Sequence, residues 1–214
     1  MALFAPTVSG QSLEDEVPGR FEVAVGPIWA GATSFGTIDA TETAADGGRY
    51  RLFSTTTELA SATGVEARAG FHLVRSLQAE IALSYAVPEL RTRVGADSEN
   101  AVPLTASESI QRIGVEGAVV LFLPHWRFGH LVPFVRGGSG YLRQLHEGQA
   151  LVERGHLYEA GGGVSMLVRA RPRARFKGLG LRADVRASFR PESVALDRRT
   201  HVAPEMTASV FGRF

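Results

Sequence analysis

The stretch GLGLRADVRASFRP, residues 178–191, alternates charged and apolar side chains along its whole length. One face of an extended chain would carry the charged residues Arg182, Asp184, Arg186 and Arg190. The opposite face would carry Leu179, Leu181, Ala183, Val185, Ala187 and Phe189. A period of two residues predicts a β-strand with two different surroundings, one on each face. In a soluble sheet the charges would face water, whereas in a membrane barrel they would face the lumen.

The composition limits the classes of protein that fit. The 214 residues suffice for one domain, and 23 basic against 22 acidic residues give a net charge of +1, so no nucleic-acid partner is expected. Without cysteine, disulfides, thiolate metal sites and thiol nucleophiles are excluded. No apolar run approaches the about 18 residues of a transmembrane helix. Residues 1–19 form an N-terminal tail that is either the remnant of a signal peptide or a plain disordered terminus.

The same alternation recurs along the rest of the chain and predicts eight strands in all. The segments are 20–34, 63–73, 77–86, 110–123, 132–144, 157–169, 178–191 and 201–214. The second and third form a hairpin around a tight turn at 74–76. A further strand-like piece, 49–61, is either an extension of the second strand or part of a loop hairpin. A bulge or bend is expected at Pro27, which cannot donate to a ladder.

The connections between these segments alternate in length. Long polar connections fall at about 35–62, 88–109, 145–156 and 190–200, and short ones at 74–76, 124–130 and 170–178. Long connections at one end and short turns at the other are typical of up-and-down membrane barrels.

The polar faces of the strands decide between two kinds of barrel. A lipocalin-like barrel is apolar inside, and an outer-membrane barrel is polar inside. Here the polar faces mix small residues with charges of both signs, as a narrow, side-chain-filled lumen requires. Aromatic residues gather toward strand ends, as in interfacial girdles. The membrane barrel is therefore favoured, with a lumen charge network of Glu22, Glu66, Arg68, Glu80, Arg112, Glu116, Arg136, Glu159, Arg182, Asp184, Arg186 and Glu205.

Residues 20–214 resemble the eight-stranded outer-membrane β-barrel family, of the OmpA-transmembrane-domain, OmpX and OmpW type. The resemblance rests on the Gly-rich strand PFVRGGSGY (133–141) and on the end of the chain. It implies an all-β, antiparallel, up-and-down transmembrane barrel in the bacterial outer membrane, in contact with its lipids. It also implies an insertion signal that the barrel-assembly machinery reads, formed by Met206, Ala208, Val210, Gly212 and Phe214.

The sequence offers no catalytic, cofactor or metal site. The histidines lack a metal-ligand spacing, and Ser139 and Ser165 lie within strands with no Ser–His–acid set around them. We therefore expect a monomeric, non-enzymatic barrel with a structural role in the envelope or a role in surface recognition through its outer loops. Two alternatives remain open: a narrow, OmpW-like channel for small or apolar solutes, and a soluble lipocalin-like ligand-binding barrel.

Overall fold

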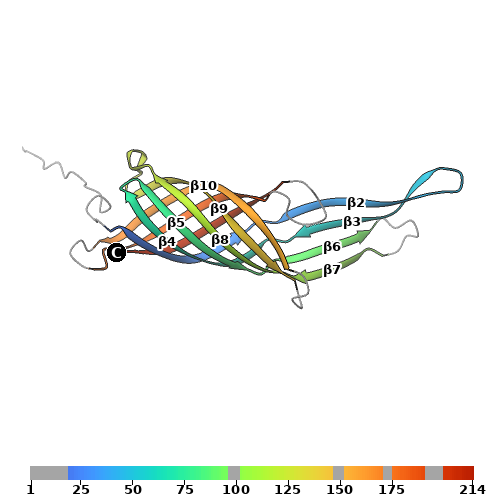
Figure 1. Cartoon of the computed structure of the whole chain (residues 1–214), viewed down its shortest axis with the longest axis horizontal. Coiled ribbons are helices and arrows are strands. Elements are labelled where there is room, and N and C mark those ends of the chain that lie inside the picture. The colour runs from blue at the N-terminus through green and yellow to red at the C-terminus, as the bar shows by residue number, and fades with distance from the viewer. Residues whose placement is uncertain (1–18, 96–101, 147–151, 171–174, 191–199) are drawn as a thin grey trace, which may run out of the picture.

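The computed structural model describes residues 19–95, 102–146, 152–170, 175–190 and 200–214, and the barrel is their main feature (Figure 1). Its eight strands are β1 (Phe21–Ala30), β4 (Ala62–Val74), β5 (Leu77–Ala86), β8 (Gln111–Phe122), β9 (Leu131–Leu145), β10 (Val152–Ala170), β11 (Gly178–Arg190) and β12 (His201–Arg213). Each pairs antiparallel with the next, and β12 closes on β1. The predicted fold class and the eight predicted strand segments are confirmed.

The alternation of the sequence becomes a difference between the two faces of the barrel wall. Along β11, Arg186 is 2 % exposed, whereas its neighbour Val185 is 52 % exposed. In the other strands, too, the charged residues assigned to the lumen are buried and most large apolar residues of the opposite face are exposed, although Val120, Phe134 and Phe211 are buried on the inner side. This arrangement is the reverse of a soluble lipocalin-like barrel, whose interior is apolar.

Two local expectations are wrong. The pairing of β1 with β4 runs without a shift from Phe21–Phe71 to Ala30–Ala62, so no bulge occurs at Pro27, whose side chain points outward. The expected loop at 145–156 is shorter than predicted, because β9 and β10 stay paired up to Leu145 and Val152; residues 147–151 lie outside the described residues. A 3₁₀ turn, η1 (Pro124–Trp126), lies in the connection between β8 and β9.

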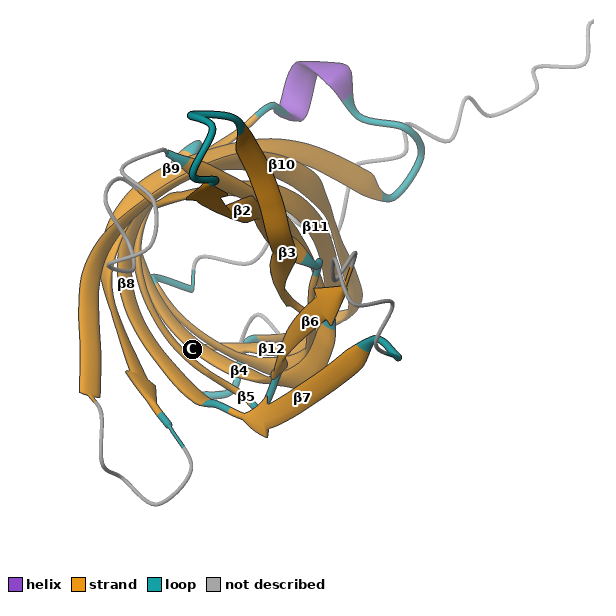
Figure 2. Cartoon of the chain, turned by 90° about the vertical axis from the view of Figure 1, so that its right-hand side faces the viewer, coloured by secondary structure: helices purple, strands orange, loops and turns teal. Residues whose placement is uncertain are grey.

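A second, four-stranded sheet projects from the end of the barrel opposite the C-terminus (Figures 1 and 2). It consists of β2 (Thr33–Thr43), β3 (Arg49–Leu59), β6 (Glu89–Gly95) and β7 (Leu104–Ser109), in the order β2-β3-β6-β7. We call it the loop sheet. The piece at 49–61 is therefore part of a loop hairpin, and the connections expected at 35–62 and 88–109 are mostly strands.

The loop sheet joins two hairpins that are distant in the sequence. Strand β3 pairs with β6 from Ser54–Gly95 to Leu59–Leu90. Within the first hairpin, the hydroxyls of Thr37 and Thr56 are 2.9 Å apart. Tyr50 donates a hydrogen bond of 3.0 Å to Glu42, and this bond to a carboxylate raises the pKa of Tyr50. The two hairpins therefore form one hydrogen-bonded unit.

Glycines allow β10 and β11 to approach closely on the lumen side. A Cβ atom at Gly161 would lie 2.4 Å from the carbonyl oxygen of Val185, and one at Gly163 would lie 2.1 Å from that of Ala183. Both distances are far below van der Waals contact, so this part of the wall requires glycine.

Nearly all of the tail at 1–19 lies outside the described residues. Within the residues that the structure describes, no helix is long and apolar enough to cross a membrane.

Candidate functional site

The lumen holds all of the charged residues that the sequence assigned to it. Each is at most 7 % exposed, and Arg190 and Arg213 are buried beside them. We call these residues together the lumen network: Glu22, Glu66, Arg68, Glu80, Arg112, Glu116, Arg136, Glu159, Arg182, Asp184, Arg186, Arg190, Glu205 and Arg213. Seven are acidic and seven are arginines, so their formal charges cancel, as burial of charge requires.

Asp184 lies at the centre of one half of the lumen network. Arg68 donates to both of its oxygens, at 2.7 and 3.2 Å, and Thr207 donates to it at 2.8 Å. Arg136 lies 3.7 Å away, and Arg182, its neighbour on β11, 3.8 Å away. The carboxylate of Asp184 is therefore held mainly by an arginine from β4, on the far side of the lumen.

Arg186 is the centre of the other half, and four carboxylates surround it. It pairs with Glu66, lies 2.9 Å from Glu205 and 3.3 Å from Glu159, and lies 3.7 Å from Glu116. These carboxylates come from four different strands, so a single guanidinium ties together much of the barrel circumference. A buried charge of this kind is stable only while its partners remain in place.

Two ion pairs cross the full width of the barrel. Arg182 on β11 donates to Glu80 on β5 at 2.6 Å, and Arg112 on β8 donates to Glu205 on β12 at 2.7 Å. In each case the two strands stand opposite each other in the ring of eight. The side chains therefore meet across the lumen and bridge it.

A smaller cluster lies toward the chain termini. Arg213 donates to Glu22 at 3.0 Å, and the imidazole of His72 lies 3.6 Å from the same carboxylate. The prediction omitted Arg213 and Arg190 from the network, although both are in phase with the charged residues of their own strands. Extending the two-residue period to the last position of each strand would have included them.

The residues of the expected insertion signal lie along the outer face of β12. Met206 and Val210 are exposed, and Phe214 follows the last residue of the strand. The backbone of Phe214 exchanges hydrogen bonds with Phe21, at 2.7 and 3.3 Å, and its ring lies 5.5 Å from that of Phe176. The end of the chain therefore closes the seam between β12 and β1.

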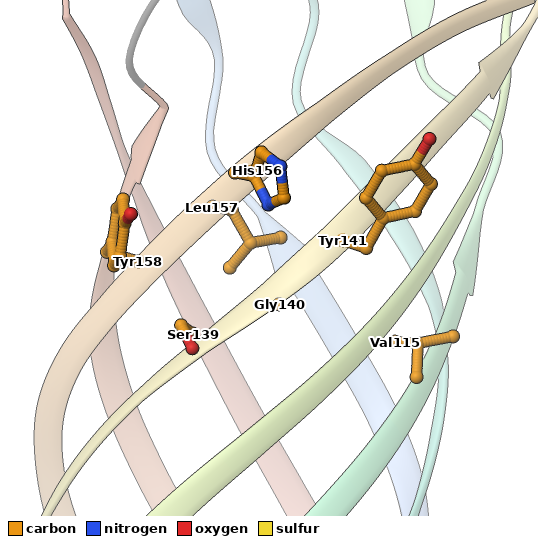
Figure 3. Close-up of a pocket in the computed structure, with 7 residues that line it drawn as sticks. All are labelled: Val115, Ser139, Gly140, Tyr141, His156, Leu157 and Tyr158. Atoms are coloured by element: carbon orange, nitrogen blue, oxygen red, sulfur yellow. The ribbon is translucent and has the colours of Figure 1, made fainter.

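A hollow of about 310 Å³, which the sequence did not predict, lies in the wall formed by β8, β9 and β10. Tyr141 and Tyr158 flank Ser139 and Gly140 in it (Figure 3). The other lining residues are Val115, His156 and Leu157. His156 was expected in a loop, but it lies in β10 with its ring 5.8 Å from that of Tyr141.

The described residues contain no group of three or more side chains that could hold a metal ion. Ser139 points to the outer face of the wall, whereas Ser165 is buried on the lumen side. The two serines therefore do not share a surface.

Neither a protein-family model nor a curated protein matches the chain. Among solved structures, Neisserial surface protein A (NspA) is similar, with a TM-score of 0.53 and 13 % identity over 91 % of this chain and 97 % of that one. The outer membrane protein OprG from Pseudomonas aeruginosa has a TM-score of 0.45, with 11 % identity over 91 % and 95 % of the two chains. The outer membrane protein AlkL has a TM-score of 0.45, with 12 % identity over 100 % of this chain and 96 % of that one.

The likeness to NspA concerns the fold. The chain has the architecture of the eight-stranded outer-membrane barrels, as the resemblance in its sequence implied.

Proposed function

We propose that this chain is a monomeric, non-enzymatic barrel of the bacterial outer membrane that acts through its loop sheet, in surface recognition or in support of the envelope. The barrel would anchor the loop sheet, and the loop sheet would meet partners outside the cell. The observation that carries the proposal is the pair of cross-lumen bridges, Arg182–Glu80 and Arg112–Glu205, because a barrel bridged in this way is an anchor rather than an open pore.

The outer wall supports insertion in a membrane. Its outward face is apolar along β11, from Leu179 to Phe189, a rise of about 25 Å at the usual strand tilt, which matches the apolar band of outer-membrane barrels. Exposed aromatic residues flank this band. Those at the loop-sheet end are Trp29, Tyr85, Tyr141 and Tyr158, and those at the other end are Phe21, Phe71 and Phe214.

The membrane proposal is tested with vesicles and with intact cells. The refolded protein should float with lipid vesicles, and heating should shift its gel mobility from a compact to an unfolded form. On intact cells, trypsin should cleave after Arg49 or Arg51 in the loop sheet while the barrel stays protected. Recovery of the protein in solution without detergent, or protection of the loop sheet on intact cells, would contradict the proposal.

The channel alternative is tested by planar-bilayer conductance. We expect no stable conductance steps from the wild-type barrel, because the bridges fill its cross-section. Steady stepwise currents from the wild type would favour the narrow channel instead. The variant Arg182→Ser with Glu80→Ser removes one bridge without leaving an unpaired charge, and it serves as the comparison that shows whether the bridges limit conductance.

A further inference from the structure

Two arginines face each other on the outer wall, close to the loop-sheet end. Arg143 on β9 and Arg154 on β10 are direct cross-strand partners, and both are exposed. Like charges directly opposite each other destabilise a sheet. In the loop sheet, by contrast, Arg51 and Arg91 each have a carboxylate neighbour, Asp39 at 3.8 Å and Glu89 at 2.9 Å. No carboxylate among the described residues forms an ion pair with Arg143 or Arg154, so the pair is suited to an anion from outside the chain.

The hollow described above lies directly beside this pair. Tyr141 and His156 follow Arg143 and Arg154 at two-residue spacing on the same face, about 5 Å nearer the middle of the wall. Beyond them the hollow opens over Ser139 and Gly140, where the side chains are smallest. Its volume of about 310 Å³ has room for several methylene groups. The order along the wall is therefore cationic, then aromatic, then hollow.

This order matches that of a membrane lipid. Tyrosines mark the boundary between hydrocarbon and headgroups, so the two arginines would lie at headgroup height and the hollow at acyl-chain depth. Two guanidiniums suit a phosphate monoester best, because it carries about −1.5 to −2 at neutral pH, whereas a phosphodiester carries a single charge. The shared chemistry is a phosphate monoester linked to acyl chains.

We infer that the wall around Arg143, Arg154, Tyr141, His156 and Ser139 binds one phosphorylated glycolipid of the lipid A class from the outer leaflet. A phosphate monoester lies between the two guanidiniums, and an acyl chain occupies the hollow. The inference rests on the proposed function, because it requires the barrel to span the membrane with the loop sheet outside.

The test uses the full chain, refolded in detergent and mixed with defined lipids, with bound lipid counted by native mass spectrometry. We expect one bound lipid A that carries phosphate monoesters, and about ten-fold weaker retention of dephosphorylated lipid A and of phosphatidylglycerol. The double variant Arg143→Gln with Arg154→Gln should lose retention by about the same factor. Arg169→Gln, which removes an exposed arginine near the other end of β10, is the matched control and should retain lipid as the wild type does.

A second variant tests the hollow. Ser139→Leu fills it with an apolar side chain that suits a lipid-facing position, so the barrel should fold while lipid retention falls. The heat-induced shift in gel mobility checks folding for every variant. Equal retention of the phosphorylated and dephosphorylated lipids, equal retention of phosphatidylglycerol, or unchanged retention by the double variant would each overturn the inference.

The two proposals fail in distinguishable ways. A protein that does not float with vesicles contradicts the membrane proposal itself. A protein that floats and shows the heat-induced shift, but binds the lipids without selectivity, contradicts only the lipid site.

Discussion

Replacing Arg186 by methionine should be among the most damaging substitutions in the barrel. The change removes the guanidinium and leaves Glu66, Glu116, Glu159 and Glu205 around a shorter, neutral side chain. Removal of one partner from a buried ion pair costs about 3–5 kcal/mol, and here several carboxylates lose their common partner. We therefore expect the free energy of unfolding to fall by at least about 4 kcal/mol.

The assay is urea unfolding in lipid vesicles, followed by the fluorescence of the two tryptophans, Trp29 in the barrel wall and Trp126 in η1. With a slope of about 2–3 kcal/mol per molar urea, a loss of about 4 kcal/mol lowers the midpoint by about 1.3–2 M. Arg51→Met is the matched control, because the Arg51–Asp39 pair has side chains 53 % and 47 % exposed, and it should cost less than about 1 kcal/mol. Adding Glu116→Gln to Arg186→Met should restore part of the loss, because the ion pair of Glu116 is with Arg186. A midpoint for Arg186→Met equal to that of Arg51→Met would refute this reasoning.

Three further predictions concern the wall, the seam and the loop sheet. Gly163→Ala should slow refolding and lower the unfolding midpoint, because its Cβ would meet the carbonyl oxygen of Ala183, whereas Gly137→Ala, whose Cβ would have 3.9 Å of clearance, should not. Deletion of Phe214 should reduce the amount of folded barrel in the outer membrane, measured as the heat-shifted fraction, and unchanged levels would contradict the insertion signal. Replacement of residues 33–59 by a short Gly-Ser linker should leave the heat-induced shift intact, because the barrel strands pair without them; loss of the shift would contradict the independence of the barrel.

The barrel strands could be predicted because each separates two different surroundings. A residue such as Val185 outside and Arg186 inside makes the period of two visible in the sequence. The loop sheet lacks this contrast. Its apolar residues Ile38, Tyr50 and Phe53 are exposed, as are most of the polar residues of β2. Its hairpins are held by backbone pairing and by contacts such as Thr37–Thr56, which leave no periodic pattern.

The membership of the lumen network could be predicted, but its pairing could not. Glu159 was expected in the lumen charge network, and it lies 3.3 Å from Arg186 and 2.5 Å from Arg136. The pairing of Arg68 with Asp184, however, joins residues 116 positions apart. It depends on the tilt and stagger of the closed barrel, which the alternation of a single strand does not encode.

The loop sheet has a consequence for how the outer surface can vary. Strand β2 has 11 residues and spans about 35 Å, so the turn at Ala44–Gly48 stands well away from the barrel rim. Because β3 is hydrogen-bonded to β6 from Ser54 to Leu59, the second hairpin supports the part of the first hairpin that lies next to the barrel. Substitutions at the turn can accumulate without cost to the barrel, whereas a change in the paired segment Ser54–Leu59 must be accommodated by Leu90–Gly95. A peptide inserted between Asp46 and Gly47 would accordingly be displayed far from the barrel rim.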